Sequence, residues 1–393
     1  MSKILSQCSR VDGCQLKIGA RKMSTTFWIK TDQLDDEQRM AVENIPETDS
    51  FLLKGPAGSG KTNILLLRAK WLTLKRQSNF KIIVFTSSLR EFIDQGCMHY
   101  GIDPNSTTTQ MTFFKSILQE YSVPYELSNN FEADRTLLAG KVMSLIDEKR
   151  ISDGYCGTLF VDEAQDYTDT ELLVFRGLTK RLVLASDSRQ SIYKTTHTPE
   201  LPEKLVKGKI VSLRYHYRSG LKLCKVADAI LSDTAAFPRL QGECRYPEAY
   251  IPSSVTPVPC ENFSLQITAI IDNLTPQLAL YPNEKIGVLF PKREQAAEFE
   301  ALLETSPIVQ AIDRIWVDTL HGAKGWEFRA VHLGGCESLS RMGATQKRLI
   351  YTGVLRGKTS VHLYYSGRLP GYLDSAMAVL EPPRANPSFD ELF

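Results

Sequence analysis

The residues from Gly55 to Thr62 are the first group in the chain whose types and spacing could do chemistry. They read Gly-Pro-Ala-Gly-Ser-Gly-Lys-Thr and satisfy the pattern G-x-x-x-x-G-K-[ST]. Glycines let backbone N–H groups curl around phosphates, and the start of a following helix adds partial positive charge at the same place. Lys61 would then reach the β- and γ-phosphates of a nucleotide, and the Thr62 hydroxyl would bind Mg²⁺. The pattern predicts a triphosphate site formed by Gly55, Gly58, Ser59, Gly60, Lys61 and Thr62.

Two adjacent carboxylates, Asp162 and Glu163, follow the apolar run 157–161. Taken alone, such a pair is most often the solvated start of a helix. After a phosphate-binding loop and at the end of a strand, it suits a metal-holding acid and a water-activating base. We therefore predict that Asp162 holds Mg²⁺ and that Glu163 orients or deprotonates the attacking water.

These side chains need strands and helices to position them, and the surrounding pattern supplies both. Asp35 and Asp36 suit the start of a helix that runs through Met40. Strands that alternate with helices and end in polar residues indicate a parallel sheet whose carboxyl edge binds a ligand. The predicted elements are strands over 51–53, 81–85, 157–161 and 181–185, a helix over 63–75 and a helical segment over 113–149.

A second unit with the same alternation is predicted to begin near Lys209. Four prolines between 247 and 259 break the pattern and predict a loop or linker there. The predicted elements are strands over 210–213, 286–290, 315–319, 330–333 and 360–364, and a helix over 220–231. The fold class is therefore α/β, with an N-terminal extension (1–30), a first domain (31–208, with a helical insertion at about 100–156) and a second domain (209–393, with a Pro-rich insertion at about 236–262).

The bulk composition excludes several classes of protein. With 42% hydrophobic and 23% charged residues, the 393-residue chain is neither disordered nor fibrous, and its length suits two or three domains. No apolar run approaches the roughly 20 residues that a bilayer span needs, and we expect a cytoplasmic protein without a membrane partner. Eight cysteines without a C-x-x-C pair indicate neither a zinc site nor a disulfide framework. A net charge of +2 does not by itself indicate a nucleic-acid partner.

Six segments, one of which contains the acidic pair, are similar to the motifs of one helicase family. They are 34–38 (Leu-Asp-Asp-Glu-Gln), 162–166 (Asp-Glu-Ala-Gln-Asp), 185–193, 213–219 (Leu-Arg-Tyr-His-Tyr-Arg-Ser), 318–328 and 351–358. From about residue 34 to residue 364 the chain resembles the UvrD/Rep-like superfamily 1 DNA helicases. The resemblance implies two tandem RecA-like P-loop domains that bind ATP and Mg²⁺ between them.

The resemblance also implies roles for residues outside the phosphate loop. Those at the adenosine are Gln38 at the base edge, Tyr217 stacked on adenine and Glu327 at the ribose. Gln190 is implied to sense the γ-phosphate, while Arg218 and Arg356 are implied to be arginine fingers. Guanidinium groups supplied from a second domain stabilise the charge of phosphoryl transfer only when the domains close, so they couple hydrolysis to domain motion.

Contacts to nucleic acid are implied by two further segments and by the fifth motif. Residues 84–87 and 111–116 resemble elements that present hydroxyls to phosphates, here Thr86 and Thr112. Phe85 could stack on a base or could be a core aromatic, and the two readings are equally supported. His321 and Lys324 are implied to connect the nucleotide to the strand, although His321 could instead be a satisfied buried histidine.

Three departures from the family pattern bear on function. Lys194-Thr195-Thr196-His197 stand where relatives carry a tryptophan and an arginine, and the chain between Arg218 and Ile315 is too short for the large accessory domain. The third is a set of small substitutions, Ser186 for a glycine, Leu355 for a threonine and Trp326 for a leucine, which we expect hydrolysis to survive. His216 also stands where the motif has an asparagine. We expect an ATP-dependent DNA translocase or helicase that moves 3′ to 5′ along single-stranded DNA or on a tailed duplex. The alternative is a nucleotide-operated switch or assembly subunit of a repair or anti-phage complex. Strand cleavage would need a partner such as a nuclease subunit.

Overall fold

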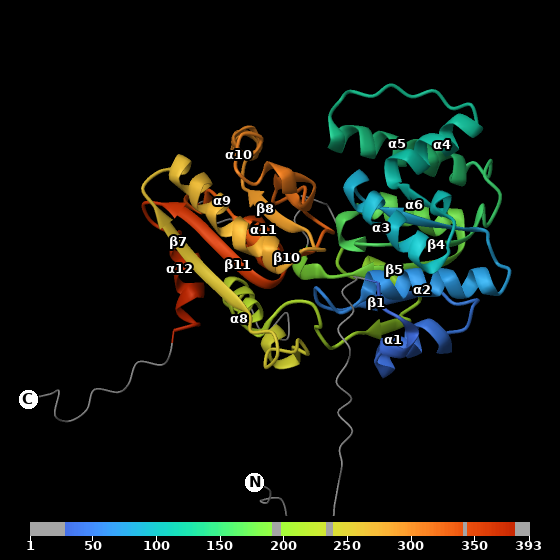
Figure 1. Ribbon diagram of the computed structural model, residues 1–393. Helices are drawn as coiled ribbons and strands as arrows, with labels where there is room; N and C mark the ends of the chain where they lie inside the picture. Colours follow the sequence, from blue (N-terminus) through green and yellow to red (C-terminus); the bar gives the residue numbers. More distant parts are fainter. Residues whose placement is uncertain (1–27, 191–197, 233–238, 341–343, 382–393) are drawn as a thin grey trace, which may run out of the picture.

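The computed structural model describes residues 28–190, 198–232, 239–340 and 344–381. These residues form two mixed α/β bodies, each built on a parallel sheet (Figure 1). The first body is coloured blue to green in Figure 1 and the second yellow to red. The prediction of an α/β fold with parallel sheets is confirmed.

The first sheet has six parallel strands in the order β3-β2-β4-β5-β1-β6. They are β1 (Phe51–Lys54), β2 (Phe80–Val84), β3 (Thr107–Thr109), β4 (Cys156–Val161), β5 (Thr179–Ser186) and β6 (Ile210–Ser212). All five strand pairings are parallel. The carboxyl ends of β1, β4 and β5 therefore meet at one edge, which brings together the segments 55–62, 162–166 and 187–190.

Helices cover both faces of this sheet because alternate strand residues point to opposite sides. Leu53 packs in a core with α2 and α3, whereas its neighbour Leu52 packs in a separate core with α4, α5 and α6. The helices are α1 (Asp36–Arg39), α2 (Lys61–Leu74), α3 (Ser87–Tyr100), α4 (Gln110–Glu120), α5 (Phe131–Asp147), α6 (Asp169–Leu178) and α7 (Leu201–Leu205). Asp35 caps α1 by accepting from the Gln38 backbone N–H at 2.8 Å, as predicted.

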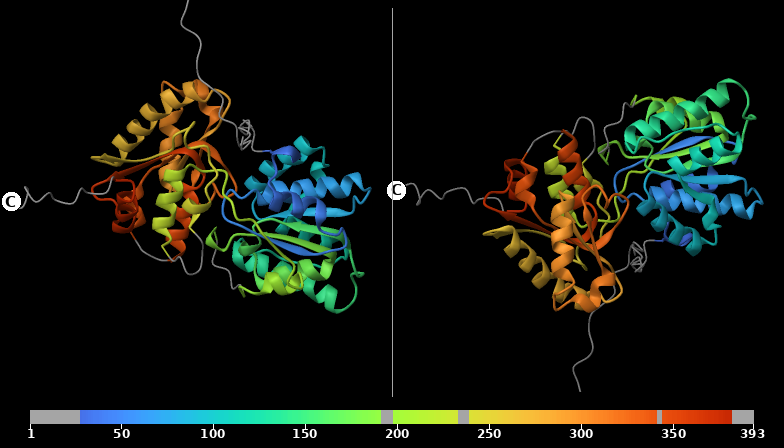
Figure 2. Two further views of the ribbon diagram at one scale, coloured as in Figure 1. Left: turned by 90° about the horizontal axis from the view of Figure 1, so that it is seen from below. Right: turned by 90° about the horizontal axis from the view of Figure 1, so that it is seen from above.

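The second sheet has five parallel strands in the order β7-β11-β10-β8-β9. They are β7 (Ser254–Cys260), β8 (Ile286–Phe290), β9 (Ile315–Thr319), β10 (Phe328–Leu333) and β11 (Gly357–Ser366). The helices of this body are α8 (Leu221–Ile230), α9 (Phe263–Leu280), α10 (Arg293–Leu303), α11 (Ala344–Val354) and α12 (Gly371–Ala378). Figure 2 shows the two bodies side by side from below and from above, with the chain crossing between them.

The boundary predicted between the domains is wrong by one strand. Residues 210–212 form β6, which pairs with β1 and extends the first sheet at its edge, with Leu52 opposite Ile210. The chain leaves the first body only after this strand, through residues 213–219. Strand spacing along the chain could not reveal this, because the open edge of β1 that accepts β6 is created by the fold.

The loop predicted over the proline cluster is partly wrong. Ser254–Cys260 form β7, which pairs only with β11 at the edge of the second sheet. Pro257 and Pro259 are exposed and alternate with Val258, so their missing N–H groups fall on the side of the strand without a neighbour. An edge position therefore tolerates both prolines.

Two other predictions differ from the structure in detail. The helical segment over 113–149 is two helices, α4 and α5, and the polar edge strand β3 had no apolar pattern to reveal it. Of the predicted N-terminal extension, residues 1–27 lie outside the described residues, while Trp28 is buried against Phe92 with ring centroids 4.9 Å apart. Residues 28–30 therefore belong to the first domain. Residues 194–197 and the start of the predicted Pro-rich insertion also lie outside the described parts.

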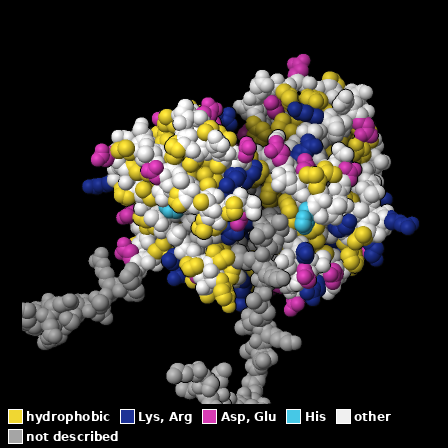
Figure 3. Space-filling view, viewed as in Figure 1, with side chains coloured by type: hydrophobic (Ala, Val, Ile, Leu, Met, Phe, Trp, Pro, Cys, Tyr) yellow, Lys and Arg dark blue, Asp and Glu magenta, His cyan; other side chains and the backbone are white. Residues whose placement is uncertain are grey.

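The distribution of surface charge and the length of the helices are relevant to two expectations, a nucleic-acid partner and no membrane partner. On the face shown in Figure 3, acidic and basic side chains are interspersed over both bodies without one broad basic field. None of the helices in the described ranges is long and apolar enough to cross a bilayer.

Candidate active site

The phosphate-type loop joins β1 to α2 and has the backbone that such a loop needs. Gly58 and Gly60 adopt φ angles of 73° and 89°, in the left-handed region that side chains disfavour. A Cβ atom at Gly58 would lie 2.6 Å from Cβ of Arg218, so this glycine also permits the close approach of the segment that leaves the first body. The buried hydroxyl of Ser59 has no hydrogen-bond partner among the described residues.

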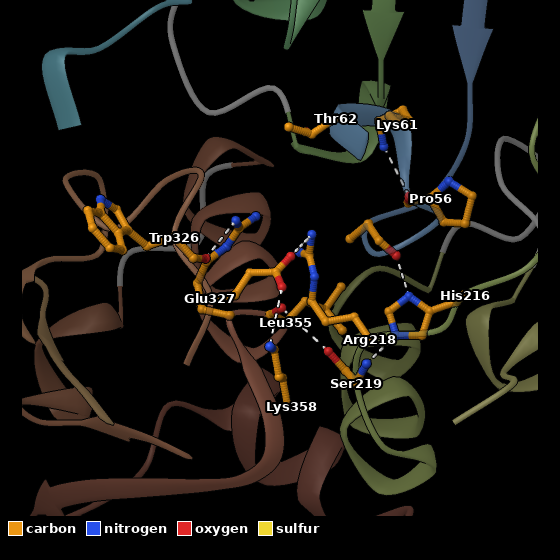
Figure 4. Close-up of polar contacts among 12 residues, drawn as sticks. Pro56, Lys61, Thr62, His216, Arg218, Ser219, Trp326, Glu327, Leu355 and Lys358 are labelled. Atoms are coloured by element: carbon orange, nitrogen blue, oxygen red, sulfur yellow. Dashed lines mark hydrogen bonds and ion pairs between the residues drawn. The ribbon is translucent and has the colours of Figure 1, made fainter. Parts of the chain in front are cut away.

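Lys61, the first residue of α2, lies folded over the loop. Its Nζ donates to the carbonyl oxygens of Gly55 at 2.9 Å and Pro56 at 3.0 Å (Figure 4). Burial lowers the pKa of Lys61, although the nearby Asp187 and Glu163 oppose that shift. The ammonium group is held by two neutral carbonyls and is available to a stronger anionic partner.

Thr62 and Asp162 meet as the sequence predicts. The Thr62 hydroxyl donates to Oδ2 of Asp162 at 2.8 Å, although 100 residues separate them. Burial, with the neighbouring Glu163, raises the pKa of Asp162 to about 6. A cation placed beside these two oxygens would relieve this unfavourable burial of negative charge.

Glu163 is buried at the carboxyl end of β4 and has a φ angle of 52°, which is uncommon for a residue other than glycine. Such strain is often found at functional sites. Burial alone would raise the pKa of Glu163, but Lys324 and Lys61 outweigh burial and lower it. The carboxylate is therefore ionised and able to accept a proton.

A relay of hydrogen bonds leads from Glu163 to the second domain. Gln165 donates from Nε2 to Glu163 and accepts at Oε1 from the Asp187 backbone N–H at 3.0 Å. Asp187 accepts from Nε2 of Gln190 at 2.8 Å, and Gln190 accepts from Nη2 of Arg356. Three polar side chains therefore connect the predicted base to the predicted arginine finger.

Arg356 lies just before β11 and is buried at the interface. Its guanidinium also donates to the carbonyl oxygens of Trp326 at 3.1 Å and Thr352 at 3.3 Å. Burial, with the nearby Arg218, lowers the pKa of Arg356 to about 10. The group thus stays charged at neutral pH while it faces the first domain.

Arg218 is directed to Glu327 instead of to the loop. The two form an ion pair, and Lys358 lies 3.9 Å from the same carboxylate (Figure 4). Nη1 of Arg218 is buried without a hydrogen-bond partner among the described residues. The stem of Arg218 lies against Gly58 of the loop, while its guanidinium points to the second domain.

His216 lies in the crossing segment, residues 213–219, where the chain passes from the first body to the second. Its ring connects this segment to the phosphate-type loop. Nε2 accepts from the Ser219 backbone N–H at 2.9 Å, so Nδ1 carries the proton and donates to the carbonyl oxygen of Ala57 (Figure 4). Burial lowers the pKa of His216 to about 4, and the ring is neutral. The neutral His216 ring thus supplies both a donor and an acceptor.

The residues expected at the adenine are engaged with each other and with the loop. Gln38 donates from Nε2 to the carbonyl oxygen of Ser59 at 2.8 Å and accepts at Oε1 from the Asp35 backbone N–H. Tyr217 donates its hydroxyl to Asp35. Contact of Gln38 with a base would require exchange of these bonds, while Glu327, expected at the ribose, is paired with Arg218.

Of the residues expected to contact nucleic acid, some are buried in the structure and others lie near the surface. Phe85 is buried between Tyr167 and Phe131, so the reading as a core aromatic applies in this conformation. Lys324 is 3% exposed and pairs with Asp166, which buries it between the domains. Three expected contacts remain near the surface or in a loop: Thr86, which caps α3, and the exposed Thr112 and His321.

Asp166 and Lys358 are interface residues for which the sequence analysis predicted no role. Asp166 accepts from Lys324 across the interface, and burial raises its pKa to about 7 although Lys324 opposes this. Burial also lowers the pKa of Lys358 beside Glu327. The signals were their positions, three residues after Glu163 and two after Arg356.

The residues present fit a magnesium nucleotide. The Thr62 hydroxyl and the Asp162 carboxylate are oxygen donors of the kind that Mg²⁺ takes together with substrate phosphates. Ser59 offers a buried hydroxyl within the loop that has no hydrogen-bond partner among the described residues, as a phosphate site requires. Compared with known proteins, the chain matches no family model and no curated protein.

Proposed function

We propose that this chain is an ATP hydrolase of the UvrD/Rep helicase type, with two RecA-like domains, that uses ATP turnover to move 3′ to 5′ along single-stranded DNA. The observation that supports this most directly is the relay from Glu163 through Gln165, Asp187 and Gln190 to Arg356. It joins a base on one domain to a guanidinium on the other, which is the connection that a motor requires.

Each residue of the site has a task in the hydrolysis of ATP. Mg²⁺, when bound, would neutralise charge on the β- and γ-phosphates from the position of Thr62 and Asp162. Lys61 leaves the carbonyls of the loop and binds the phosphates. Glu163 orients a water and takes its proton, because its ionised carboxylate lies at the same sheet edge.

The arginines provide the coupling between domains. Charge that develops on the γ-phosphoryl oxygens attracts Arg218 away from Glu327 and holds Arg356 at Gln190. When the phosphate leaves, Arg218 returns to Glu327 and the interface loses an anionic bridge. Hydrolysis thereby alternates the grip between the two domains, and the same alternation would move a bound strand.

ATPase rate with and without a single-stranded oligonucleotide, followed by strand displacement on a tailed duplex, tests this function. We expect stimulation by the oligonucleotide. Displacement would make the chain a helicase, and stimulation without displacement a translocase. Turnover that single strands leave unchanged would contradict the motor.

One observation favours the alternative of a nucleotide-operated switch. Lys324, expected on the nucleic acid, is instead buried against Asp166 between the domains, and Phe85 is buried in the core. In a switch, these contacts would transmit the nucleotide state to a bound subunit such as a nuclease. ATP turnover independent of DNA would support this second function.

A further inference from the structure

Two cysteines that the proposed hydrolysis of ATP does not use lie together beside the segment 213–219. Cys224 is in the first turn of α8, and Cys244 follows the short helix 240–243. The sulfur atoms of Cys224 and Cys244 lie 3.5 Å and 3.6 Å respectively from the carbonyl oxygen of Ser219, so the two thiols share one acceptor and lie within reach of each other. Both are free thiols in the structure.

The fold holds the two thiols at this place from both sides. Cys244 is bridged to His216: the residues on either side of it, Glu243 and Arg245, exchange backbone hydrogen bonds with His216 at 3.0 Å and 2.7 Å. The backbone N–H of Cys224 donates to the carbonyl oxygen of Gly220 at 3.0 Å, in a helix packed on the second sheet. Backbone hydrogen bonds therefore hold both cysteines in position, in addition to the contacts of their side chains.

The two thiols differ in access and acidity. Cys224 is fully buried, whereas Cys244 is half-buried. A hydrogen bond from Cys224 lowers the pKa of Cys244 to about 7, although burial and the nearby acids Glu248 and Asp228 oppose the shift. The same bond, with burial, raises the pKa of Cys224. At neutral pH Cys244 thus has a large thiolate fraction and is the more accessible nucleophile.

We propose that Cys224 and Cys244 form an oxidation-sensitive dithiol whose substrate is a hydroperoxide. The Cys244 thiolate attacks the peroxide oxygen, which gives a sulfenic acid on Cys244 and releases hydroxide from hydrogen peroxide. The Cys224 thiol then attacks that sulfur, loses its proton and expels the hydroxyl group as water. Two thiols are oxidised to one disulfide and one peroxide is reduced to two waters.

The disulfide would act on the crossing segment. The S–H donor to the carbonyl oxygen of Ser219 would be lost, and Ser219 directly follows Arg218 and donates its hydroxyl to the carbonyl oxygen of Gly357 at 2.7 Å. The consequence for ATP turnover depends on the proposed function, whereas the dithiol itself does not. Transient, regulatory disulfides of this kind occur in reducing compartments.

Peptide mapping of the full chain after treatment with hydrogen peroxide at pH 7.5 tests the dithiol. Free thiols are blocked with N-ethylmaleimide under denaturing conditions, and trypsin then releases Cys224 in peptide 223–225 and Cys244 in peptide 240–245. We expect a disulfide between these two peptides that dithiothreitol removes. In Cys224→Ser, dimedone should label Cys244 as a sulfenic acid, and Cys244→Ser should give neither product.

Cys260 is the matched control, because it is also half-buried but burial raises its pKa. Limiting iodoacetamide should label Cys244 at least about threefold faster than Cys260 at pH 7.5. Equal labelling rates, or peroxide treatment that leaves peptides 223–225 and 240–245 unlinked, would overturn the dithiol. If the disulfide forms and ATP turnover is unchanged, the regulatory consequence is refuted and the dithiol stands.

Discussion

Glu163 is buried at a strand end, has an ionised carboxylate, as a general base requires, and has the uncommon backbone angle often found at functional sites. Glu163→Gln keeps the shape but cannot accept the proton. We expect turnover to fall at least about 10²-fold while a fluorescent ATP analogue still binds. Lys61→Ala should lose both turnover and tight binding, whereas the exposed Lys75→Ala should behave as wild type. Normal hydrolysis by Glu163→Gln would remove Glu163 from the mechanism.

His216 predicts a dependence of stability on pH. Its pKa is lowered from 6.5 to about 4, so the unfolded chain binds the proton more readily than the folded chain. The stabilisation is complete above pH 6.5 and declines as pH falls toward 4, by about 2 kcal/mol between pH 7 and pH 5. Urea denaturation at both pH values measures this loss. His216→Asn, which keeps a polar side chain that does not titrate, should lose about 2 kcal/mol less over that interval; parallel pH profiles would contradict the assignment.

At the scale of elements, the insertion helices are joined to the catalytic sheet edge by a buried ion pair. Arg135 of α5 donates to Glu171 of α6, at 2.8 Å from Nε, and to the carbonyl oxygen of Asp166 at 2.9 Å. Both side chains of the pair are fully buried. Glu171→Gln leaves a buried cation without its counter-charge, so we expect a loss of about 3 kcal/mol in the free energy of unfolding.

Glu132 is the natural control for this pair, because it lies 3.5 Å from the same arginine but its side chain is 53% exposed. Glu132→Gln should change stability by less than about 0.5 kcal/mol, since exposed ion pairs contribute little. Chemical denaturation of both variants measures the difference. Equal effects would mean that the arginine is held mainly by packing against Phe85 and Phe131.

At the scale of the whole molecule, Arg356 is a residue of the second domain that donates to the side chain of Gln190 in the relay from Glu163. Arg356→Ala should lower turnover about 10³-fold, because arginine fingers stabilise the transition state more than the bound substrate. Binding of an ATP analogue should change far less. The exposed Arg293→Ala is the control, and turnover within a few-fold of wild type in Arg356→Ala would show that the domains do not share the chemistry.

Much of the site could be predicted from the sequence because its chemistry depends on local spacing. The loop 55–62 and the pair Asp162 and Glu163 are defined by neighbours along the chain, and the alternation of strands and helices placed both at one sheet edge. The Thr62 to Asp162 hydrogen bond is the consequence. These predictions needed only the rule that parallel strands end at a common edge.

Only the tertiary structure decided the edge strands and the side-chain contacts that depend on packing between segments distant in the sequence. The edge strands β6 and β7 depend on which strand is left open, and no local pattern encodes that choice. Packing of the two domains places Lys324 against Asp166, a residue 158 positions away. Folding also places the thiols of Cys224 and Cys244 at the same carbonyl oxygen. Partner and burial set the charge and reactivity of such groups, and both come into existence only when distant segments pack together.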